Sequence, residues 1–137
     1  MRRRTLLAGL GSAVSVGLAG CLGGSAELAE NEIGMSTRRF EPASKVVEAG
    51  TTVRWRNTDR GVHTVTAYDG EIPEDATYFA TGGFGSEQAA KDAWYNATGG
   101  GLDPEEAFEY TFEVPGEYDY YCIPHEAAGM VGTVVVE

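Results

Sequence analysis

The sequence predicts an all-β domain: an antiparallel Greek-key β-sandwich with a short helix-containing insertion. Two segments, 51–57 and 108–114, alternate apolar and polar residues, which is typical of half-buried strands. Turn signals stand beside them at Ala49-Gly50 and Pro115-Gly116. A chain of 137 residues is long enough for one adequate core and too short for two domains. These observations favour a single sandwich of short strands.

Each predicted strand has its own signal. Residues 39–47 are predicted as an extended edge strand, because Pro42 lacks the N–H that a central strand would donate. In 51–57, Val53 and Trp55 share one face, and the polar residues between them take the other. The remaining strands are predicted at 63–67, 118–122 and 131–136.

Residues 69–104 break the alternation and are predicted to form an insertion over one face of the sandwich. Within it, 86–96 is predicted as a short helix, because Ser86 is a suitable N-cap and several alanines follow it. Gly99-Gly100-Gly101 would end the helix. Asn96-Ala97-Thr98 is a glycosylation sequon, whose use depends on the host.

The N-terminal segment predicts export. Three arginines precede an uncharged apolar run over 6–22, and Arg3-Arg4-Thr5-Leu6-Leu7 resembles a twin-arginine signal. Leu18-Ala19-Gly20-Cys21 resembles a lipoprotein cleavage box, which makes Cys21 the predicted lipidation site. The alternative is an uncleaved signal anchor, because the apolar run is close to membrane-spanning length.

The predicted domain organisation follows from this segment. Residues 1–20 would be the export signal, 21–32 the lipidated cysteine with a flexible tether, and 33–137 the folded domain. A lipid anchor and a signal anchor give the same topology. Both place the domain at the outer face of the cell membrane.

The charge of the chain is strongly negative. It has 21 Asp and Glu against 10 Lys and Arg, a formal net charge of -11. A nucleic-acid-binding protein needs a basic face, so that class is excluded. The dispersed acids and the scarcity of lysine favour a protein adapted to high salt (a halophilic source), with an ordinary acidic exported protein as the alternative. In molar salt the Debye length is only ~3 Å, so the acids would serve solubility rather than long-range attraction.

The most informative motif is Cys122-Ile123-Pro124-His125-Glu126-Ala127-Ala128-Gly129-Met130. It places a thiolate, an imidazole and a thioether at Cys-x2-His-x4-Met spacing, a mixture that suits copper better than zinc, calcium or magnesium. His63 is the only other histidine, and it would complete a His2Cys plane with a long axial methionine. Zinc is the competing metal, but a structural zinc site needs four firm nitrogen or sulfur ligands.

Each candidate ligand also has an ordinary structural explanation. A cysteine on a strand is often a small buried hydrophobe, a methionine is usually part of a core, and a histidine more often donates hydrogen bonds. Cys21 and Cys122 are the only cysteines, and a lipid on Cys21 would leave Cys122 unpaired in an oxidising compartment. The joint spacing, with one further histidine, favours a metal centre over four separate structural roles.

Two segments resemble a known family. Residues 114–132, which contain the Cys-x2-His-x4-Met motif, are similar to the copper loop of plastocyanins and pseudoazurins. Residues 40–65 resemble the strand pair that carries the first histidine of these proteins. With its acidic composition and lipoprotein-like signal, the chain resembles the halocyanins, membrane-attached blue copper proteins of halophilic archaea. It differs at Val62, where the plastocyanin pattern has a proline before the first histidine.

The resemblance implies a cupredoxin fold and one-electron transfer without catalysis. It implies one copper ion held by His63 Nδ1, Cys122 Sγ, His125 Nδ1 and, weakly, Met130 Sδ. It also implies a hydrogen bond from the Thr64 N–H to the Cys122 sulfur, which would raise the reduction potential.

The expected partners are redox proteins, a membrane electron donor and an oxidase-type acceptor, with no small-molecule substrate and no nucleic acid; the protein would be a monomer. Electrons would leave mainly through the exposed edge of His125. A small apolar collar is expected around that edge, made by Ile123, Pro124, Ala127, Ala128 and Val131.

Two other function classes remain as alternatives. A copper-delivery module would favour an exposed, exchangeable and often Met-rich site. A copper oxidase or reductase would need a second metal site or an open coordination position, and both histidines of this chain are already used.

Overall fold

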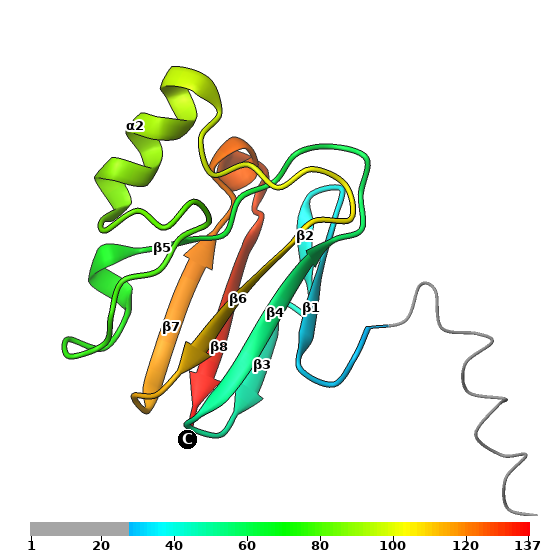
Figure 1. Cartoon of the computed structure of the whole chain (residues 1–137). Coiled ribbons are helices and arrows are strands. Elements are labelled where there is room, and N and C mark those ends of the chain that lie inside the picture. Colours follow the sequence, from blue (N-terminus) through cyan, green and yellow to red (C-terminus); the bar gives the residue numbers. More distant parts are fainter. Residues whose placement is uncertain (1–27) are drawn as a thin grey trace, which may run out of the picture.

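The computed structural model describes residues 28–137, which form two four-stranded sheets with one α-helix beside them (Figure 1). Sheet A has the strand order β2-β1-β4-β6, and sheet B has the order β3-β8-β7-β5. The strands are β1 Glu32–Ser36, β2 Arg39–Glu41, β3 Ser44–Val47, β4 Thr51–Asn57, β5 Thr66–Ala67, β6 Ala107–Phe112, β7 Gly116–Tyr121 and β8 Val131–Val136.

The predicted membrane attachment concerns a part of the chain that the structure does not describe. The signal at 1–20, the lipidation site Cys21 and the first part of the tether lie outside the described residues. Between residues 28 and 137, no helix combines the length and the apolar character needed to cross a membrane.

The predicted sandwich is confirmed, with one correction to its strand pairing. β1 runs parallel to β4, and β3 runs parallel to β8, so the sheets are mixed rather than wholly antiparallel. The reason lies in the connections. The chain passes from β2 in sheet A to β3 in sheet B and returns to sheet A for β4, and strands joined by such a crossover can pair in parallel, whereas strands joined by a hairpin cannot.

The predicted edge strand at 39–47 is two short strands. β2 is at the edge of sheet A and β3 is at the edge of sheet B, with Pro42 in the link between them. Pro42 has no N–H to donate, so the chain leaves one ladder there and joins the other.

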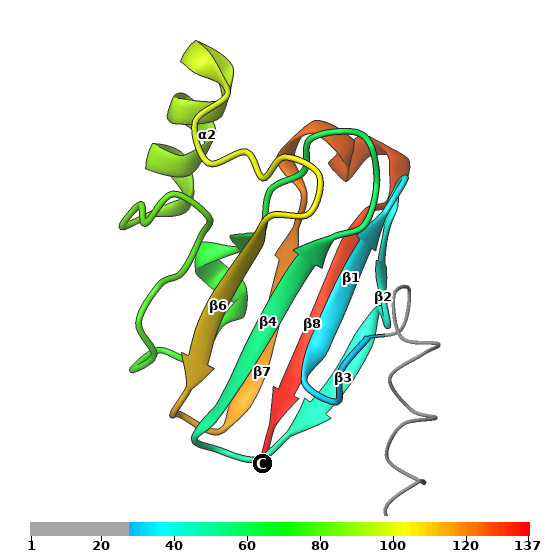
Figure 2. The same ribbon diagram turned by 45° about the vertical axis from the view of Figure 1, so that its right-hand side comes forward.

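The core lies between the two sheets (Figure 2). Val53 and Trp55 are fully buried while Thr52 and Arg54 are exposed, as the alternation predicts. Trp55 packs in an aromatic cluster with ring centroids 5.4–6.2 Å away, made by Phe79, Phe108, Phe112 and Tyr120. Such contacts between aromatic rings add to the stabilisation that burial itself gives.

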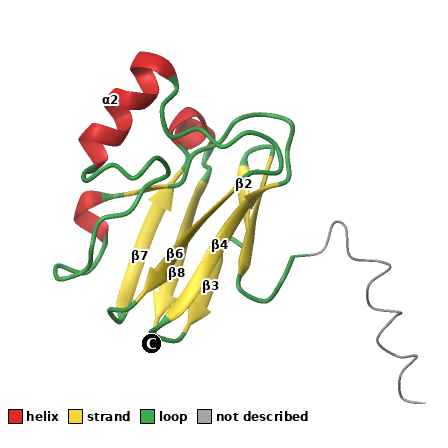
Figure 3. Cartoon of the chain, in the orientation of Figure 1, coloured by secondary structure: helices red, strands yellow, loops and turns green. Residues whose placement is uncertain are grey.

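The predicted helix is also confirmed. Helix α2 spans Glu87–Ala97, and the Ser86 side chain caps it by accepting a hydrogen bond from the Ala89 N–H (3.1 Å). The helix lies outside the sandwich, beside β5 (Figure 3). The insertion also contributes to the main core through Phe79, which is 3% exposed, so it is packed against the domain rather than loosely attached.

Candidate metal centre

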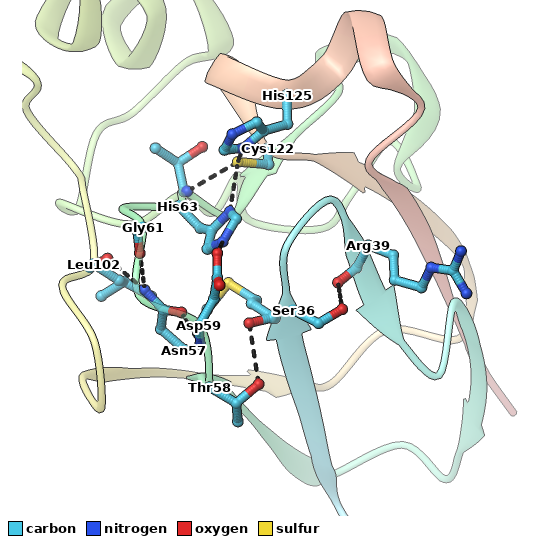
Figure 4. A network of polar contacts seen from close by, with 12 residues as sticks. Ser36, Arg39, Asn57, Thr58, Asp59, Gly61, His63, Leu102, Cys122 and His125 are labelled. Carbon is cyan, nitrogen blue, oxygen red and sulfur yellow. Dashed lines mark hydrogen bonds and ion pairs between the residues drawn. The ribbon is translucent and has the colours of Figure 1, made fainter.

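The structure brings together the side chains of His63, Cys122 and His125. One donor atom from each lies within 4.8 Å of the others. Cys122 Sγ is 3.6 Å from His63 Nδ1 and 3.4 Å from His125 Nδ1 (Figure 4). Both imidazoles therefore present to the sulfur the nitrogen that the sequence resemblance implies, and three donors converge from two segments far apart in the chain.

The loop 122–130 is closed by its own backbone. The Cys122 N–H donates to the Met130 carbonyl, the Met130 N–H donates to the His125 carbonyl, and each bond is 3.1 Å. A 3-10 helix at Ile123–Ala128 follows Cys122 and ends at Gly129, whose φ of 91° places it in the left-handed region that favours glycine. These bonds fix the position of His125 within the loop and the point at which the chain returns to the sandwich.

Met130 is placed at the base of this loop. Its side chain is fully buried and belongs to the same core cluster as Cys122. Its thioether would supply the weak soft donor that copper takes beside a thiolate and two imidazoles.

Thr64 joins the His63 segment to the Cys122 strand. Its N–H donates to Cys122 Sγ (3.3 Å), as predicted, and its hydroxyl oxygen accepts a hydrogen bond from the Ile123 N–H (2.9 Å). Both bonds are buried, so breaking either would leave an unpaired polar group away from water. Thr64 therefore sets the distance between the two segments that supply the ligands.

A backbone bridge fixes the loop before His63, where Val62 replaces the proline of the plastocyanin pattern. The His63 N–H donates to the Leu102 carbonyl (3.2 Å), and the Leu102 N–H donates to the His63 carbonyl (2.7 Å). Val62 lies directly against Gly101, where a Cβ would be 2.6 Å from Val62 Cγ1. The shape of the loop is thus set by its contact with the end of the insertion.

Asp59 orients the His63 ring. Its carboxylate oxygen is 3.0 Å from His63 Nε2, on the side of the ring that faces away from Cys122. A carboxylate only accepts hydrogen bonds, so Nε2 carries a proton in this contact, and Nδ1 is the nitrogen that faces the sulfur. Metal-ligating histidines ordinarily have such a partner behind them.

Asn57 stabilises the turn that contains Asp59. Its side chain is fully buried, and its amide donates to the carbonyls of Gly61 (2.7 Å) and Leu102 (2.9 Å). Its side-chain oxygen accepts a hydrogen bond from the Asp59 N–H (2.9 Å). The sequence predicted this segment only as a turn. The spacing of four residues between Asp59 and His63 was the available signal for the pair.

The electrostatics of the site suit a bound cation. Burial raises the pKa of the Cys122 thiol, although the Thr64 N–H partly offsets this, so a cation must supply the charge that stabilises the thiolate. Partial burial lowers the pKa of His125, with further lowering from His63 and Arg38, and this keeps its ring neutral and able to ligate. The hydrogen bond from His63, with others from backbone N–H groups, lowers the pKa of Asp59, which keeps that group ionised.

Solvent reaches only one of the four candidate ligands. His63, Cys122 and Met130 are fully buried, whereas His125 is partly exposed. The expected apolar collar around it needs one correction: Ile123 is 6% exposed and packs beneath the insertion instead. The exposed apolar residues of the collar are Pro124, Ala127, Ala128 and Val131.

The donor set fits copper. One thiolate, two imidazoles and a buried thioether combine soft and borderline donors, and a second cysteine, which structural zinc sites usually have, is absent from residues 28–137.

Comparison with known proteins agrees with this donor set. The family model described as copper-binding proteins of the plastocyanin/azurin family matches residues 28–137. The chain is 33% identical over 98 residues to plastocyanin of Scenedesmus fuscus, covering 72% of this chain and 86% of that protein. It is also 33% identical over 98 residues to the chloroplastic plastocyanin of Tetradesmus obliquus, of which it spans 58%.

Solved structures show the same fold. An oxidised point mutant of amicyanin is 28% identical, with a TM-score of 0.57, over 82% of this chain and 88% of that one. A pseudoazurin from Sinorhizobium is 26% identical, with a TM-score of 0.55, over 77% and 72% of the two chains. The fold and the site thus define a cupredoxin, a two-sheet β domain built around one copper centre. The chain belongs to the copper-binding plastocyanin/azurin family.

Proposed function

We propose that this protein is a type 1 (blue) copper one-electron carrier, with His63, Cys122, His125 and Met130 as the copper ligands. The observation that carries this proposal is the convergence of three donor atoms within 4.8 Å, two from the loop 122–130 and one from the segment before β5, which hydrogen bonds hold together. When bound, copper supplies the chemistry by gaining or losing one electron between its two common oxidation states.

The residues around the site hold the candidate ligands in place. Thr64 and the bonds that close the loop hold the thiolate, while Asp59 and Asn57 hold the first histidine. Ligands fixed in this way move little when the charge of the site changes, which keeps the reorganisation cost of electron transfer low. The partly exposed ring of His125 connects this closed site to the surface.

The carrier function is favoured over the two alternatives. A copper-delivery module needs an exposed site with exchangeable ligands, and three of the four ligands here are fully buried. An oxidase needs an open coordination position for its substrate. Both histidines of the chain already point at the one thiolate, so a carrier rather than an enzyme fits the site best.

The cellular setting is part of the same proposal. An exported chain with a lipid on Cys21 would hold the copper domain at the outer face of the cell membrane, as a halocyanin of a halophilic organism would be held. Its partners would then be a membrane electron donor and an oxidase-type acceptor, which the monomer meets in turn. The described domain begins close to Cys21, since β1 starts at Glu32, so the tether would be short.

Absorption and EPR spectra of the copper-loaded protein test the proposal, with Cys122→Ser as the control. Oxidised copper bound to a thiolate gives an intense colour, so the wild type should be strongly coloured and the serine variant should lose the band. Fast and reversible one-electron voltammetry with copper retained should follow. A colourless wild type after copper loading and oxidation would refute a blue copper site, and loss of copper on reduction would point to a delivery module.

A further inference from the structure

Tyr121 stands next to the thiolate in the chain and on the outer face of sheet B. Tyr118 and Tyr120 of β7, and Cys122 directly after it, belong to the main core, so by alternation Tyr121 points outward. Residues on the outer face of a sheet are normally exposed to solvent, yet Tyr121 has no exposed surface. It belongs to a second apolar cluster, separate from the main core. The direct route from the buried sulfur to this flank of the molecule is therefore covered.

The insertion provides the cover. The second cluster contains Ala80 and Ala90 of the insertion, with Trp94 of α2 packed against it. The Tyr121 hydroxyl donates to the Glu87 carboxylate of α2 at 2.8 Å, and Lys91 lies 5.8 Å from the centre of the Tyr121 ring. Figure 1 shows α2 standing beside the upper part of β7 and the loop that follows it.

Further contacts hold the cover in place on both sides. The Tyr68 ring stacks on the Tyr121 ring with a centroid distance of 4.3 Å, and the Tyr68 hydroxyl donates to Glu126 of the loop 122–130 at 2.7 Å. At the start of α2, the Asp69 N–H donates to the Glu87 carboxylate (3.0 Å). The Glu87 carboxylate is thus bonded from two sides, and the helix is anchored to the segment that follows β5.

We propose that the insertion makes this protein a carrier with a single electron-transfer surface. Electrons would enter and leave only over the partly exposed His125 ring, through the face formed by Pro124, Ala127, Ala128 and Val131, here called the His125 face. The flank over Tyr121, here called the covered flank, would take no part. This inference rests on the proposed electron-carrier function.

The proposal defines the kind of partner that fits. Donor and acceptor must both present an apolar contact surface around an exposed edge of their own redox centre, because the His125 face is apolar and small. Since both need the same face, they compete for it and cannot be bound together. The protein would then have to release one partner before it meets the other.

The test places a charge on each surface and measures which charge changes the rate of oxidation by a small oxidant. The reduced, copper-loaded protein is oxidised by one electron, either by the tris(phenanthroline)cobalt(III) cation or by the hexacyanoferrate(III) anion, at about 0.1 M ionic strength, where charges more than ~10 Å apart are screened. The variants are Ala127→Glu and Ala127→Lys on the His125 face. The matched controls are Gln88→Glu and Gln88→Lys on the exposed side of α2. Each pair changes the net charge of the protein equally.

If electrons use a single surface, the rates with both oxidants should depend on the charge at residue 127 and not on the charge at residue 88. Ala127→Glu should raise the oxidation rate with the cation and lower the rate with the anion by about threefold or more. Ala127→Lys should do the reverse, and the Gln88 variants should change either rate by less than about twofold. The cation is the more demanding probe, because the covered flank carries the carboxylates of Glu87 and Asp69, which would attract it.

Other results overturn the inference. If the cation rate follows the charge at residue 88, or responds equally at the two positions, electrons use the covered flank as well. No response at residue 127 also contradicts it. Failure of the carrier function itself is distinguishable, because the protein would then lack the thiolate absorption band or a reversible one-electron wave before any rate is measured.

Discussion

The two histidines of the site are held in opposite ways. His63 is fully buried, bonded to Asp59 behind its ring, and fixed by backbone bonds to Leu102. His125 is partly exposed, and its position depends on the short loop 122–130. One imidazole is therefore a fixed part of the scaffold, while the other is a candidate ligand that solvent reaches.

The difference shows how one small domain can be rigid and accessible together. Rigidity comes from the arm that contains Asn57, Asp59 and His63, where the polar groups are bonded to one another. Access comes from the loop 122–130, where His125 is partly exposed. No single residue therefore has to provide both rigidity and access.

The largest expected effect is complete loss of the native site, with different rescue at the two histidines. His125→Gly should bind copper and recover the thiolate band when imidazole is added, because the vacated position opens to solvent. His63→Gly should not recover it, because that position is closed. Absorption spectra titrated with imidazole measure both, and equal rescue of the two variants would contradict the proposed difference.

Next in size is the loss of the amide that holds the rigid arm. Asn57→Ala removes three hydrogen bonds of a fully buried side chain, two donated to the Gly61 and Leu102 carbonyls and one accepted from the Asp59 N–H, so the free energy of unfolding should fall by about 2–3 kcal/mol. Chemical denaturation of the metal-free protein measures this change. A loss below about 0.5 kcal/mol would mean that the arm does not depend on Asn57.

Removing the charge behind His63 should shift the reduction potential. Asp59→Asn keeps an acceptor for Nε2–H but removes a negative charge that favours the oxidised, more positive site. The potential should therefore rise by about 60 mV, the equivalent of a tenfold change for one electron. Voltammetry measures the shift.

A matched variant beside the other histidine serves as the control for this shift. Glu126→Gln removes an exposed carboxylate that neighbours His125 and is bonded by Tyr68, so its effect should be clearly smaller. A larger shift from Glu126→Gln than from Asp59→Asn would reverse the assignment of the rigid arm.

The smallest expected effect lies away from both histidines, on the outer face of sheet A. Partial burial alone would raise the pKa of Glu32, but the Ala29 N–H and the guanidinium groups of Arg56 and Arg54 outweigh it, and the pKa is lowered from 4.5. Its stabilisation is thus fully present above pH 4.5 and is lost as the pH falls through the lowered value.

Glu32→Gln should accordingly cost about 1 kcal/mol at neutral pH and nothing in strong acid. Thermal unfolding at several pH values measures the difference between the variant and the wild type. The reduction potential should not change, because Glu32 contacts no candidate ligand; a clear shift would show that sheet A is coupled to the site.

Local patterns predicted much of this molecule. The alternation in β4, the Ser86 cap of α2 and the spacing from Cys122 to Met130 each depend on neighbouring residues, and the structure agrees with them. The Thr64 bond to the sulfur was implied by resemblance rather than by pattern, and it is present.

The features that were missed depend on contacts between distant segments. The parallel pairing of β1 with β4 follows from where the chain crosses between sheets, which alternation does not reveal. The burial of Ile123 and Tyr121 depends on where the insertion packs, and nothing in the local sequence of either residue shows it. The composition of the segment around Asp59 predicts only a turn, and the contact of Asp59 with His63 depends on how that turn folds.

X-ray absorption at the copper edge of the loaded protein, beside that of Cys122→Ser, tests the central claim most directly. The proposed centre predicts one close sulfur and two close imidazole nitrogens in the wild type, with the close sulfur absent from the variant. A wild-type spectrum with only nitrogen and oxygen ligands, or one that the serine variant reproduces, would contradict it.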